Sequence, residues 1–394
     1  MAKLSISDLD LDGQRVLIRV DFNVPIRDGA VDNDKRVVAA LPTIRYALRS
    51  GASVVLMSHL GRPKGEVCEE FSLRPVAACL GRHLGREVAF AGDCIGDEAR
   101  DAVANLSRGN VLLLENLRFH PGEQHPEEEP GFADALAEHG DVYVNDAFGT
   151  AHRAHASMVA VAEHFEQRAA GLLLARELDY FAKALSKPAR PFVTVLGGAK
   201  VSDKILVLEN LLGKVDRLII GGAMAYTFLR AQGIAVGDSR VEEDKLDLAL
   251  SILDAAEAKG VDVLLPTDHV CGRTFAEDTE CETFEQIPDG WIGLDIGPAS
   301  ARRYAEAIAA AGTVIWNGPM GVFEWPAFAE GTMTLARACA ESKALTIVGG
   351  GDSASAAKKS GLADRFDHIS TGGGASLELL EGKTLPGVEV LNDA

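Results

Sequence analysis

Short apolar runs rich in Val, Ile and Leu recur along the whole chain. Each run is followed by a polar or glycine-rich tip and then by a segment with helical periodicity, which is typical of parallel strands joined by helices. The runs lie at 16–20, 53–57, 111–114 and 142–144, and again at 192–196, 217–220, 261–265, 313–316 and 346–348. The pattern predicts an α/β fold of two Rossmann-like domains, each a mostly parallel sheet flanked by helices.

One amphipathic segment, RELDYFAKALSKPARP, separates the two halves. It places Leu178, Phe181 and Leu185 at spacings of three and four residues and ends in a turn with two prolines. We interpret it as a hinge helix followed by a boundary near 186–191. We therefore expect an N-terminal domain at 1–172, a connecting helix and hinge at 173–190, and a C-terminal domain at 191–378. For the tail at 379–394, an ordered end and a strap that packs back on the first domain both remain open.

The expected strand ends differ between the two halves, and in open α/β sheets ligands gather at these ends. Those of the second half are rich in glycine, at Gly197, Gly198, Gly221, Gly222, Gly318 and 349–351. Those of the first half carry Asp21, Asn23, His59, Arg62, Arg118, Asn145, Asp146, His152 and Arg153. The first half is therefore expected to grip a small anion with side chains, and the second to let a phosphate chain approach backbone amides.

Four arginines, Arg36, Arg62, Arg118 and Arg153, each lie beside an expected strand end or turn. The planar guanidinium matches carboxylate and phosphate oxygens, so convergent arginines indicate an anion site, whereas separate surface ion pairs are the alternative. His152 and His155 form an HxxH pair, but no third or fourth zinc ligand is evident at a usual spacing. We expect one of these histidines to contact the anion and the other to be structural.

In the second half, the segment GGAKVSDK places Lys200 and Lys204 four residues apart at the expected start of a helix, where backbone amides and two ammonium groups would cradle phosphate. Asp352 follows three glycines and is a candidate Mg²⁺ ligand, with a helix N-cap as the alternative. The glycines at 372–374 precede another helix, whose N-terminus would face developing negative charge.

Composition narrows the partners. The chain has 39 Lys and Arg against 58 Asp and Glu, which gives a net charge of −19. This charge disfavours binding to nucleic acid and to anionic membranes. Any anionic partner is therefore expected to be small and to be bound by a local patch of basic residues. Six cysteines without a CxxC pair indicate neither a zinc knuckle nor a disulfide framework. No export signal and no run of 18 or more apolar residues is found, so we expect a cytoplasmic protein without a membrane partner.

Ten motifs, taken together and in order, resemble the phosphoglycerate kinase family. They are RVDFNVP, SHLGRP, ENLRFH, NDAFGTAHRAH, ELDYFAKAL, GGAKVSDKI, GLDIGP, WNGPMGVFE, GGGDSA and STGGGASLELLEG, and they cover almost the whole chain. The resemblance implies a monomeric two-domain kinase of glycolysis whose domains close for the reaction. Its reaction would be the reversible transfer of the acyl phosphate of 1,3-bisphosphoglycerate to MgADP, giving 3-phosphoglycerate and MgATP.

The resemblance also implies the roles of individual residues. Arg36 and Lys200, with the amides of Gly351 and Gly374, would stabilise the transferring phosphoryl group. Phosphoglycerate would be bound by Asp21, Phe22, Asn23, Arg36, His59, Leu60, Gly61, Arg62, Arg118, His152 and Arg153. The adenine nucleotide would be bound by Gly198, Ala199, Lys200, Lys204, Gly222, Gly293, Glu324, Gly350, Gly351, Asp352 and Ser353, with Gly293 near the adenine, Glu324 on the ribose and Asp352 on the metal. The segment LPTDHV departs from the more apolar strand end usual in the family, which leaves the adenine-side wall open.

The expected reaction agrees with the residue types. A carboxylate nucleophile is already anionic at neutral pH, so phosphoryl transfer needs positioning and charge stabilisation and no general base. Two alternatives remain at this point: another ATP-dependent α/β phosphotransferase, and a non-catalytic bilobal protein that binds an anion.

Overall fold

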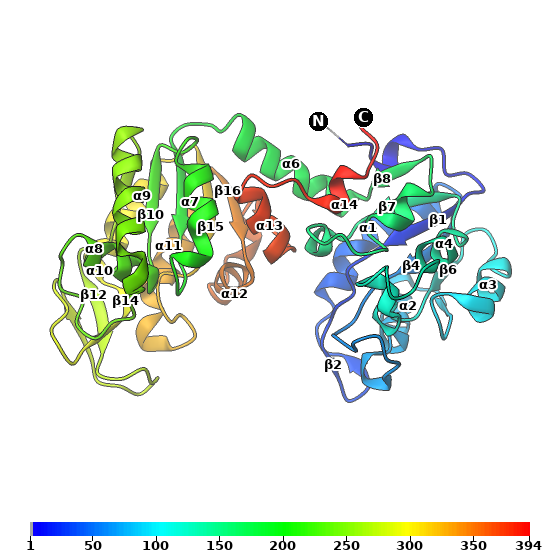
Figure 1. The fold of residues 1–394 in the computed structure, drawn as a ribbon, viewed down its shortest axis with the longest axis horizontal. Helices are drawn as coiled ribbons and strands as arrows, with labels where there is room; N and C mark the ends of the chain where they lie inside the picture. Colours follow the sequence, from blue (N-terminus) through cyan, green and yellow to red (C-terminus); the bar gives the residue numbers. More distant parts are fainter. Residues whose placement is uncertain (1–2) are drawn as a thin grey trace. The chain divides into compact units, whose positions relative to one another are not determined.

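The structure is a computed structural model that describes residues 3–394. The chain forms two compact units. The first unit extends to Leu178 and takes in Thr384–Ala394, and the second spans Asp179–Lys383. In Figure 1 the first unit runs from blue to green and includes the red α14 (Pro386–Glu389).

The first unit is built on a six-stranded parallel sheet in the order β5-β6-β4-β1-β7-β8. The strands are β1 (Arg15–Arg19), β4 (Ser53–Met57), β5 (Ala89–Phe90), β6 (Val111–Leu113), β7 (Val142–Asn145) and β8 (Arg168–Ala170), with a small hairpin of β2 (Ile26–Arg27) and β3 (Ala30–Val31). The helices are α1 (Lys35–Arg49), α2 (Arg74–Leu84), α3 (Gly96–Ala104), α4 (Phe132–Ala137), α5 (Ala160–Glu163) and the start of α6 (Leu172–Ser186). Buried side chains of β1 and β4 pack against α1 and α2 to form the core.

The second unit repeats this plan with the strand order β11-β10-β9-β15-β16-β17, again all parallel. Its strands are β9 (Phe192–Leu196), β10 (Arg217–Ile220), β11 (Asp262–Leu264), β15 (Thr313–Asn317), β16 (Leu345–Gly349) and β17 (His368–Ile369). Its helices are α7 (Ile205–Leu211), α8 (Met224–Ala231), α9 (Leu246–Ala258), α10 (Pro298–Ala309), α11 (Glu330–Glu341), α12 (Gly351–Lys359) and α13 (Gly373–Leu380). A separate antiparallel sheet joins β12 (His269–Gly272), β13 (Cys281–Phe284) and β14 (Ile292–Ile296).

The predicted α/β fold is confirmed. Each of the nine predicted runs forms a strand, with ends that agree within one residue. The short strands β5, β8 and β17 and the antiparallel sheet were not predicted. Strands of two or three residues are too short to give a recognisable period, and β13 is largely exposed, so it has no apolar run.

The chain passes between the units through α6, whose first turn is anchored in the first unit. The buried carboxylate of Asp146 accepts hydrogen bonds at Oδ1 from the amides of Leu173 (2.9 Å) and Leu174 (3.2 Å). The hydroxyl of Thr43 accepts one from the amide of Leu172 (2.9 Å). Burial raises the pKa of Asp146 to about 7. The first turn of α6 is thereby tied to the end of β7 and to α1.

The tail from Thr384 packs within the first unit. The side-chain amide of Asn145 donates to the carbonyl of Gly387 (2.8 Å), and the amide of Arg168 donates to Oδ1 of Asn392 (2.7 Å). Leu385 and Leu391 are buried. The tail therefore supports the ends of β7 and β8.

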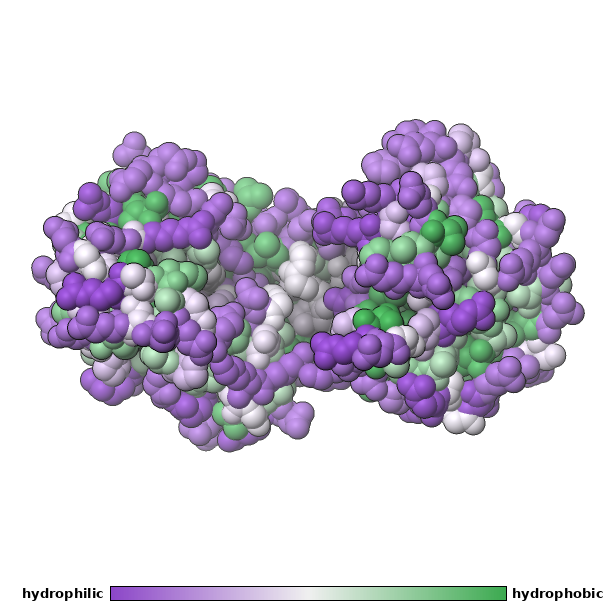
Figure 2. All heavy atoms as spheres, turned by 90° about the horizontal axis from the view of Figure 1, so that it is seen from below, coloured by the Kyte–Doolittle hydropathy of each residue, from purple (hydrophilic) through white to green (hydrophobic). Residues whose placement is uncertain are grey.

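The surface offers no extended apolar area on the face drawn in Figure 2, which is mostly hydrophilic with separate small hydrophobic areas. None of the helices formed by residues 3–394 is long and apolar enough to span a membrane.

Candidate active site

The first group of candidate residues lies where β1, β4 and β6 end. Arg36, in the first turn of α1, places Nη1 2.9 Å from Oδ1 of Asp21 and donates from the same atom to the carbonyl of Asn23 (2.9 Å). The side chain of Asn23 accepts from the amide of Gly61 (3.0 Å), and the carbonyl of Gly61 accepts from Nη1 of Arg118 (2.7 Å). These hydrogen bonds connect three strand ends and bring the two guanidinium groups to one edge of the sheet. We call Arg36, Arg62, Arg118 and Arg153, with Arg19, the arginine cluster.

Arg19 is the member of this cluster that the sequence analysis missed. It is the last residue of β1 and is fully buried. Its Nε donates to the hydroxyl of Ser157 (2.8 Å), and its Nη2 lies 3.1 Å from Nδ1 of His59 and 3.8 Å from Oε1 of Glu123. Glu123 also accepts from the hydroxyl (2.7 Å) and the amide (2.9 Å) of Ser157. The available signal was a charged residue inside the apolar run RVLIRV, since a buried charge needs a partner.

The remaining expected residues of this group differ in their exposure to solvent. Arg62 and Arg153 are exposed, and His152 is half-buried. Phe22 and Leu60 are buried in the core, so only their backbone is available to a ligand. The amide of Leu60 donates to Oδ1 of Asn116 (3.1 Å), whose side chain donates back to the carbonyl of Leu60 (2.7 Å). Asn116, which was not predicted, therefore holds the SHLGRP loop in place.

Burial and neighbouring cations set the protonation of this site. Burial, with repulsion from Arg19, lowers the pKa of His59 well below its usual value and that of His155 to about 4. Burial and then Arg19 also lower the pKa of Arg118. Both histidines are accordingly neutral at pH 7, and the positive charge of the site belongs to arginines, which stay charged. Neither His152 nor His155 belongs to any group of three candidate metal ligands in residues 3–394.

In the second unit, six of the eleven residues expected to bind nucleotide line a cavity of about 520 Å³ at the carboxyl ends of the strands, whereas Lys200, Lys204, Gly350, Gly351 and Ser353 do not line it. The loops after β9, β10 and β15 approach one another so closely that side chains would not fit. A Cβ added to Gly318 would lie 2.1 Å from the carbonyl oxygen of Gly197, and one on Gly222 would lie 2.6 Å from the amide nitrogen of Gly198. Glycine is required here because backbone meets backbone.

The cavity is lined in part by expected residues and in part by residues that the sequence analysis missed. The expected ones are Gly198, Ala199, Gly222, Gly293, Glu324 and Asp352. Those missed are Tyr226, Asp238, Arg240, Phe275, Met320 and Val322, together with other loop residues. Gly293 lies directly against Tyr226, since an added Cβ would be 2.1 Å from the phenolic oxygen. An apolar wall with few polar groups is typical of a site for a flat aromatic base.

Helices α12 and α13 begin side by side at this edge of the sheet. Gly350, with φ of 89°, is the N-cap of α12, and a Cβ on Gly373 would lie 3.5 Å from the amide nitrogen of Gly351. The hydroxyl of Ser353 accepts from the amide of Gly318 (2.6 Å), so Ser353 ties α12 to the neighbouring loop. Two helix N-termini in one place favour binding of an anion.

Asp352 does not cap α12, because Gly350 occupies that position and no side-chain capping bond is made. Its carboxylate is exposed and lines the cavity. Lys200 is exposed, whereas Lys204 is half-buried and donates to Oδ1 of Asn317. Burial lowers the pKa of Lys204. The N-cap alternative for Asp352 is therefore wrong.

The unusual segment LPTDHV serves the fold. Asp268 accepts hydrogen bonds from the amides of Ala299 (2.8 Å) and Ser300 (2.7 Å) at the start of α10. His269 is buried, and burial lowers its pKa to about 4. Neither residue lines the cavity, so the polar character of this segment leaves the cavity wall unchanged.

Comparisons with known proteins decide the family. The model of the family described as phosphoglycerate kinase matches residues 6–383. The chain is 58% identical over 395 residues to a protein of Moorella thermoacetica and 56% identical over 398 residues to one of Anaeromyxobacter dehalogenans, both named phosphoglycerate kinase and both matched over 100% of each chain. The solved phosphoglycerate kinase of Coxiella burnetii superposes with a TM-score of 0.90 at 43% identity, covering 98% of each chain.

The chain belongs to the phosphoglycerate kinase family. It is accordingly a glycolytic transferase that phosphorylates a carboxyl group and uses ATP and ADP as substrates. The resemblance seen in the ten sequence motifs is confirmed, and so is the enzyme class expected from them. The alternatives of an unrelated phosphotransferase and a non-catalytic anion-binding protein are excluded by this membership.

The buried histidines generate a prediction about pH. The unfolded chain takes up a proton on His155 near pH 6.5, whereas the native state does so only near pH 4. The native state therefore loses stability relative to the unfolded state as the pH falls through this window. Replacing His155 with Gln should reduce that loss by up to about 3 kcal/mol at pH 4, because one proton-binding difference is removed.

Urea unfolding between pH 7 and pH 4, followed by circular dichroism, measures this effect. His164→Gln is the matched control, since the His164 side chain is 41% exposed. Equal pH dependence of the unfolding midpoint in His155→Gln and wild type would show that His155 is not held neutral by burial.

Proposed function

We propose that the enzyme holds phosphoglycerate on the arginine cluster of the first unit and the adenine nucleotide, with Mg²⁺, in the cavity of the second. The observation that supports the phosphoglycerate site is an excess of positively charged side chains in the arginine cluster. The cations that act on His59, Arg118 and His155 include Arg19, Arg36, Arg62, Arg118 and Arg153, whereas the opposing carboxylates are Asp21 and Glu123, which act on Arg118. In a chain of net charge −19, a bound phosphate and carboxylate would relieve this local repulsion.

The chemistry needs no general base at this site. In the direction that consumes ATP, the nucleophile is the carboxylate of 3-phosphoglycerate, which is anionic at neutral pH. His59 is neutral, buried and hydrogen-bonded to Arg19, so its role is to orient the guanidinium and to contact substrate oxygens. Catalysis then consists of alignment and stabilisation of charge on the transferring group.

For the nucleotide, we assign the phosphates to the glycine loops and to the first turns of α12 and α13. Lys200 and Lys204 supply positive charge to these phosphates, and Glu324 binds the ribose. The base lies near Gly293, where Tyr226 is behind the backbone and Met320 and Val322 also line the cavity. Bare amides at helix N-termini suit a phosphate chain because the chain can approach the backbone directly.

Mg²⁺ fits the donor set around Asp352. This carboxylate is exposed, makes no capping bond and lines the same cavity as the glycine loops. One carboxylate with phosphate oxygens and water is the usual coordination of Mg²⁺ in nucleotide sites. When bound, the ion would neutralise charge on the nucleotide phosphates, while Arg36, Lys200 and the amides of Gly351 and Gly374 act on the transferring group.

We also propose a cytoplasmic monomer whose units close during the cycle. The two substrates are assigned to different units, so they must be brought together before transfer, and closure would exclude water that could hydrolyse the acyl phosphate. The hinge is assigned to the end of α6 and to 186–191, where the chain passes into the second unit.

Replacement of Arg36 tests the assignment on the phosphoglycerate side. Arg36→Ala should lower kcat by about 100-fold or more, since it removes a cation from the transferring phosphoryl group. The Kd for ADP should not change, because the nucleotide is assigned to the other unit. Arg108→Ala, which removes an exposed arginine paired with Asp12, is the matched control.

The measurement is a coupled assay of ATP consumption in the presence of 3-phosphoglycerate, with ADP binding followed by calorimetry. Arg36→Lys should recover part of the lost rate because it restores the positive charge without the planar set of guanidinium donors. A kcat near the wild-type value in Arg36→Ala would refute the assignment.

Replacement of Asp352 tests the metal assignment. Wild type should bind ADP more tightly with Mg²⁺ than with a chelator, and Asp352→Asn should lose most of this difference, a change of about 10-fold or more. Calorimetry with and without Mg²⁺ measures it, and Asp364→Asn, at an exposed aspartate, is the control. If Asp352→Asn kept the full Mg²⁺ effect, another residue would have to hold the ion.

Small-angle scattering tests closure and the monomer together. The radius of gyration should fall when both 3-phosphoglycerate and a non-reactive MgATP analogue are present, and less with either alone. The forward scattering should correspond to one chain of 41.8 kDa throughout. An unchanged radius with both ligands would rule out closure, and a doubled mass would rule out the monomer.

A further inference from the structure

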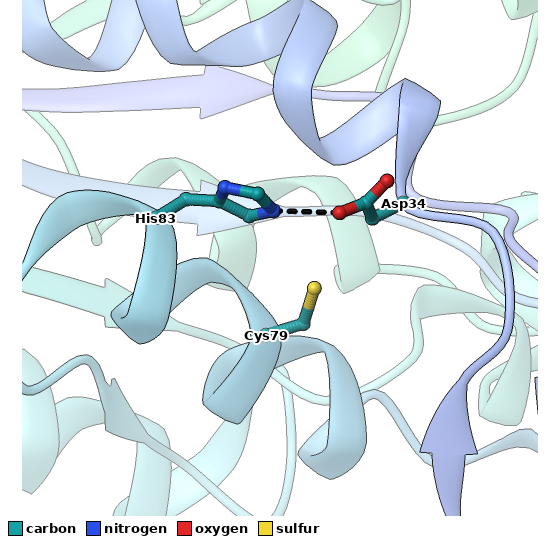
Figure 3. Close-up of side chains that lie close together, drawn as sticks. All are labelled: Asp34, Cys79 and His83. Carbon is teal, nitrogen blue, oxygen red and sulfur yellow. Dashed lines mark hydrogen bonds and ion pairs between the residues drawn. The ribbon is translucent and has the colours of Figure 1, made fainter.

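Three side chains with metal-binding atoms meet in the first unit, outside the arginine cluster. Cys79 and His83 lie on α2 four residues apart, so they share one face of that helix. Asp34 immediately precedes α1 and points toward them from the other side (Figure 3). One ligand atom from each of the three side chains lies within 4.8 Å of the other two.

The carboxylate of Asp34 is directed at His83. Asp34 occupies the N-cap position of α1, yet its side chain makes no capping bond to the helix. Its Oδ2 lies 2.8 Å from Nε2 of His83 instead. Figure 3 shows the sulfur of Cys79 directed from the next turn of α2 toward this pair. The N-cap side chain of α1 therefore does not cap the helix. It lies beside the imidazole of His83 and the thiol of Cys79.

We propose that Asp34, Cys79 and His83 bind one Zn²⁺ ion, with water as the fourth ligand. Zinc is bound by sulfur, nitrogen and oxygen at about 2.0–2.3 Å in tetrahedral geometry, which places neighbouring ligand atoms roughly 3–4 Å apart. The existing spacing needs only small side-chain movements to reach this geometry. A thiolate and a carboxylate together balance the two charges of the ion.

The proton changes on binding are defined. The proton that Nε2 of His83 shares with Asp34 would move through solvent to Nδ1, leaving a neutral ring whose Nε2 lone pair faces the ion. The thiol of Cys79 would lose its proton to solvent. Burial raises the pKa of this thiol, and the neighbouring Arg82 partly offsets the rise by favouring the thiolate. Arg82 remains near the ion as an opposing charge, so the proposed affinity is moderate.

A second cluster of the same residue types shows what distinguishes this one. His120 is held at Nε2 by Asp93 (2.7 Å) and at Nδ1 by Glu129 (2.8 Å), and these bonds raise its pKa. Both ring nitrogens are thus committed to carboxylates, and the adjacent Cys94 is fully buried. A ring held as an imidazolium has no lone pair for a metal. The ring of His83 pairs with a single carboxylate, through Nε2, and its side chain is 32% exposed, which gives an ion a route of entry.

The site would connect the start of α1 to α2. Arg36 lies in the first turn of α1, two residues after Asp34. An ion that binds the native state and not the unfolded chain stabilises the fold by an amount that grows with the logarithm of its concentration above its Kd. Zn²⁺ would therefore fix the turn that carries Arg36.

Cobalt titration of the full chain tests the proposal, because Co²⁺ takes the place of Zn²⁺ and absorbs in the near ultraviolet when a thiolate coordinates it. The chelator-treated protein should show this absorption, saturating at one ion per chain, and Zn²⁺ should abolish it whereas Mg²⁺ should not. Cys79→Ser should remove the absorption. His83→Gln should raise the apparent Kd for Co²⁺ about 10-fold or more.

Matched variants separate this site from others. Cys339→Ser, at a buried cysteine of the second unit, and His164→Gln, at an exposed histidine paired with Asp134, should both keep the absorption. A metal held by Asp352 gives no thiolate absorption, so failure of the proposed Mg²⁺ site would not be mistaken for this result. Absence of the absorption in wild type, its persistence in Cys79→Ser, or its loss in Cys94→Ser instead would each overturn the proposal. If Cys79→Ser failed to fold, an unchanged Kd in His83→Gln would overturn it equally.

Discussion

The buried guanidinium of Arg19 is the interaction on which the first unit's site depends. A charge at the carboxyl end of a central strand is costly to bury unless it is paired and hydrogen-bonded. Arg19 meets this need with Glu123 and Ser157, with His59, and with the carbonyl of Val20. Its partners come from the loops that follow β1, β4 and β7 and from the turn at Pro121–Glu123, so pairing the charge also fixes those loops. The exposed arginines of the site lie on or beside these loops.

Arg19 also determines the protonation of its neighbours. It is among the causes that lower the pKa of His59, His155 and Arg118, while its attraction opposes the rise that burial imposes on the pKa of Glu123. The two histidines are held in their neutral forms, while the pKa of Glu123 still lies above its ordinary value because burial outweighs the attraction of Arg19. In the second unit, the loops after the strands instead bring glycine backbones into close contact. In the proposed function, one unit recognises an anion with side-chain charge, and the other with the backbone.

Sequence analysis was accurate where the information is local. Buried parallel strands are continuous apolar runs, so β4 and β9 could be located almost to the residue. The glycines at strand ends also located the loops of the second unit, because they too are a local feature of the sequence. Contacts between distant segments left no such trace. Arg19 and Ser157 are 138 residues apart, and only the fold brings them together.

The cavity wall illustrates the same limit. Tyr226, Asp238 and Phe275 come from a helix and two loops with ordinary helical or loop patterns, and none carries a motif of its own. Asp352 could equally have been a helix cap by its sequence, and only the backbone angles of Gly350 separate the two alternatives. A residue type and a spacing can suggest a role, but the capping position is decided by φ and ψ, which a single sequence does not report.

A site charged by arginine has a functional advantage over one charged by histidine. Histidine changes charge near neutral pH, so the affinity of a histidine-based site for an anion would vary with small changes in the pH of the cell. Here burial and neighbouring cations keep His59 and His155 neutral, and the charge is left to groups that remain protonated at any physiological pH. The electrostatic potential at the proposed anion site then does not depend on the titration of these two histidines across the neutral range. A reaction that needs charge stabilisation and no proton transfer from the enzyme is well served by such a site, since nothing in it has to titrate for transfer to proceed in either direction.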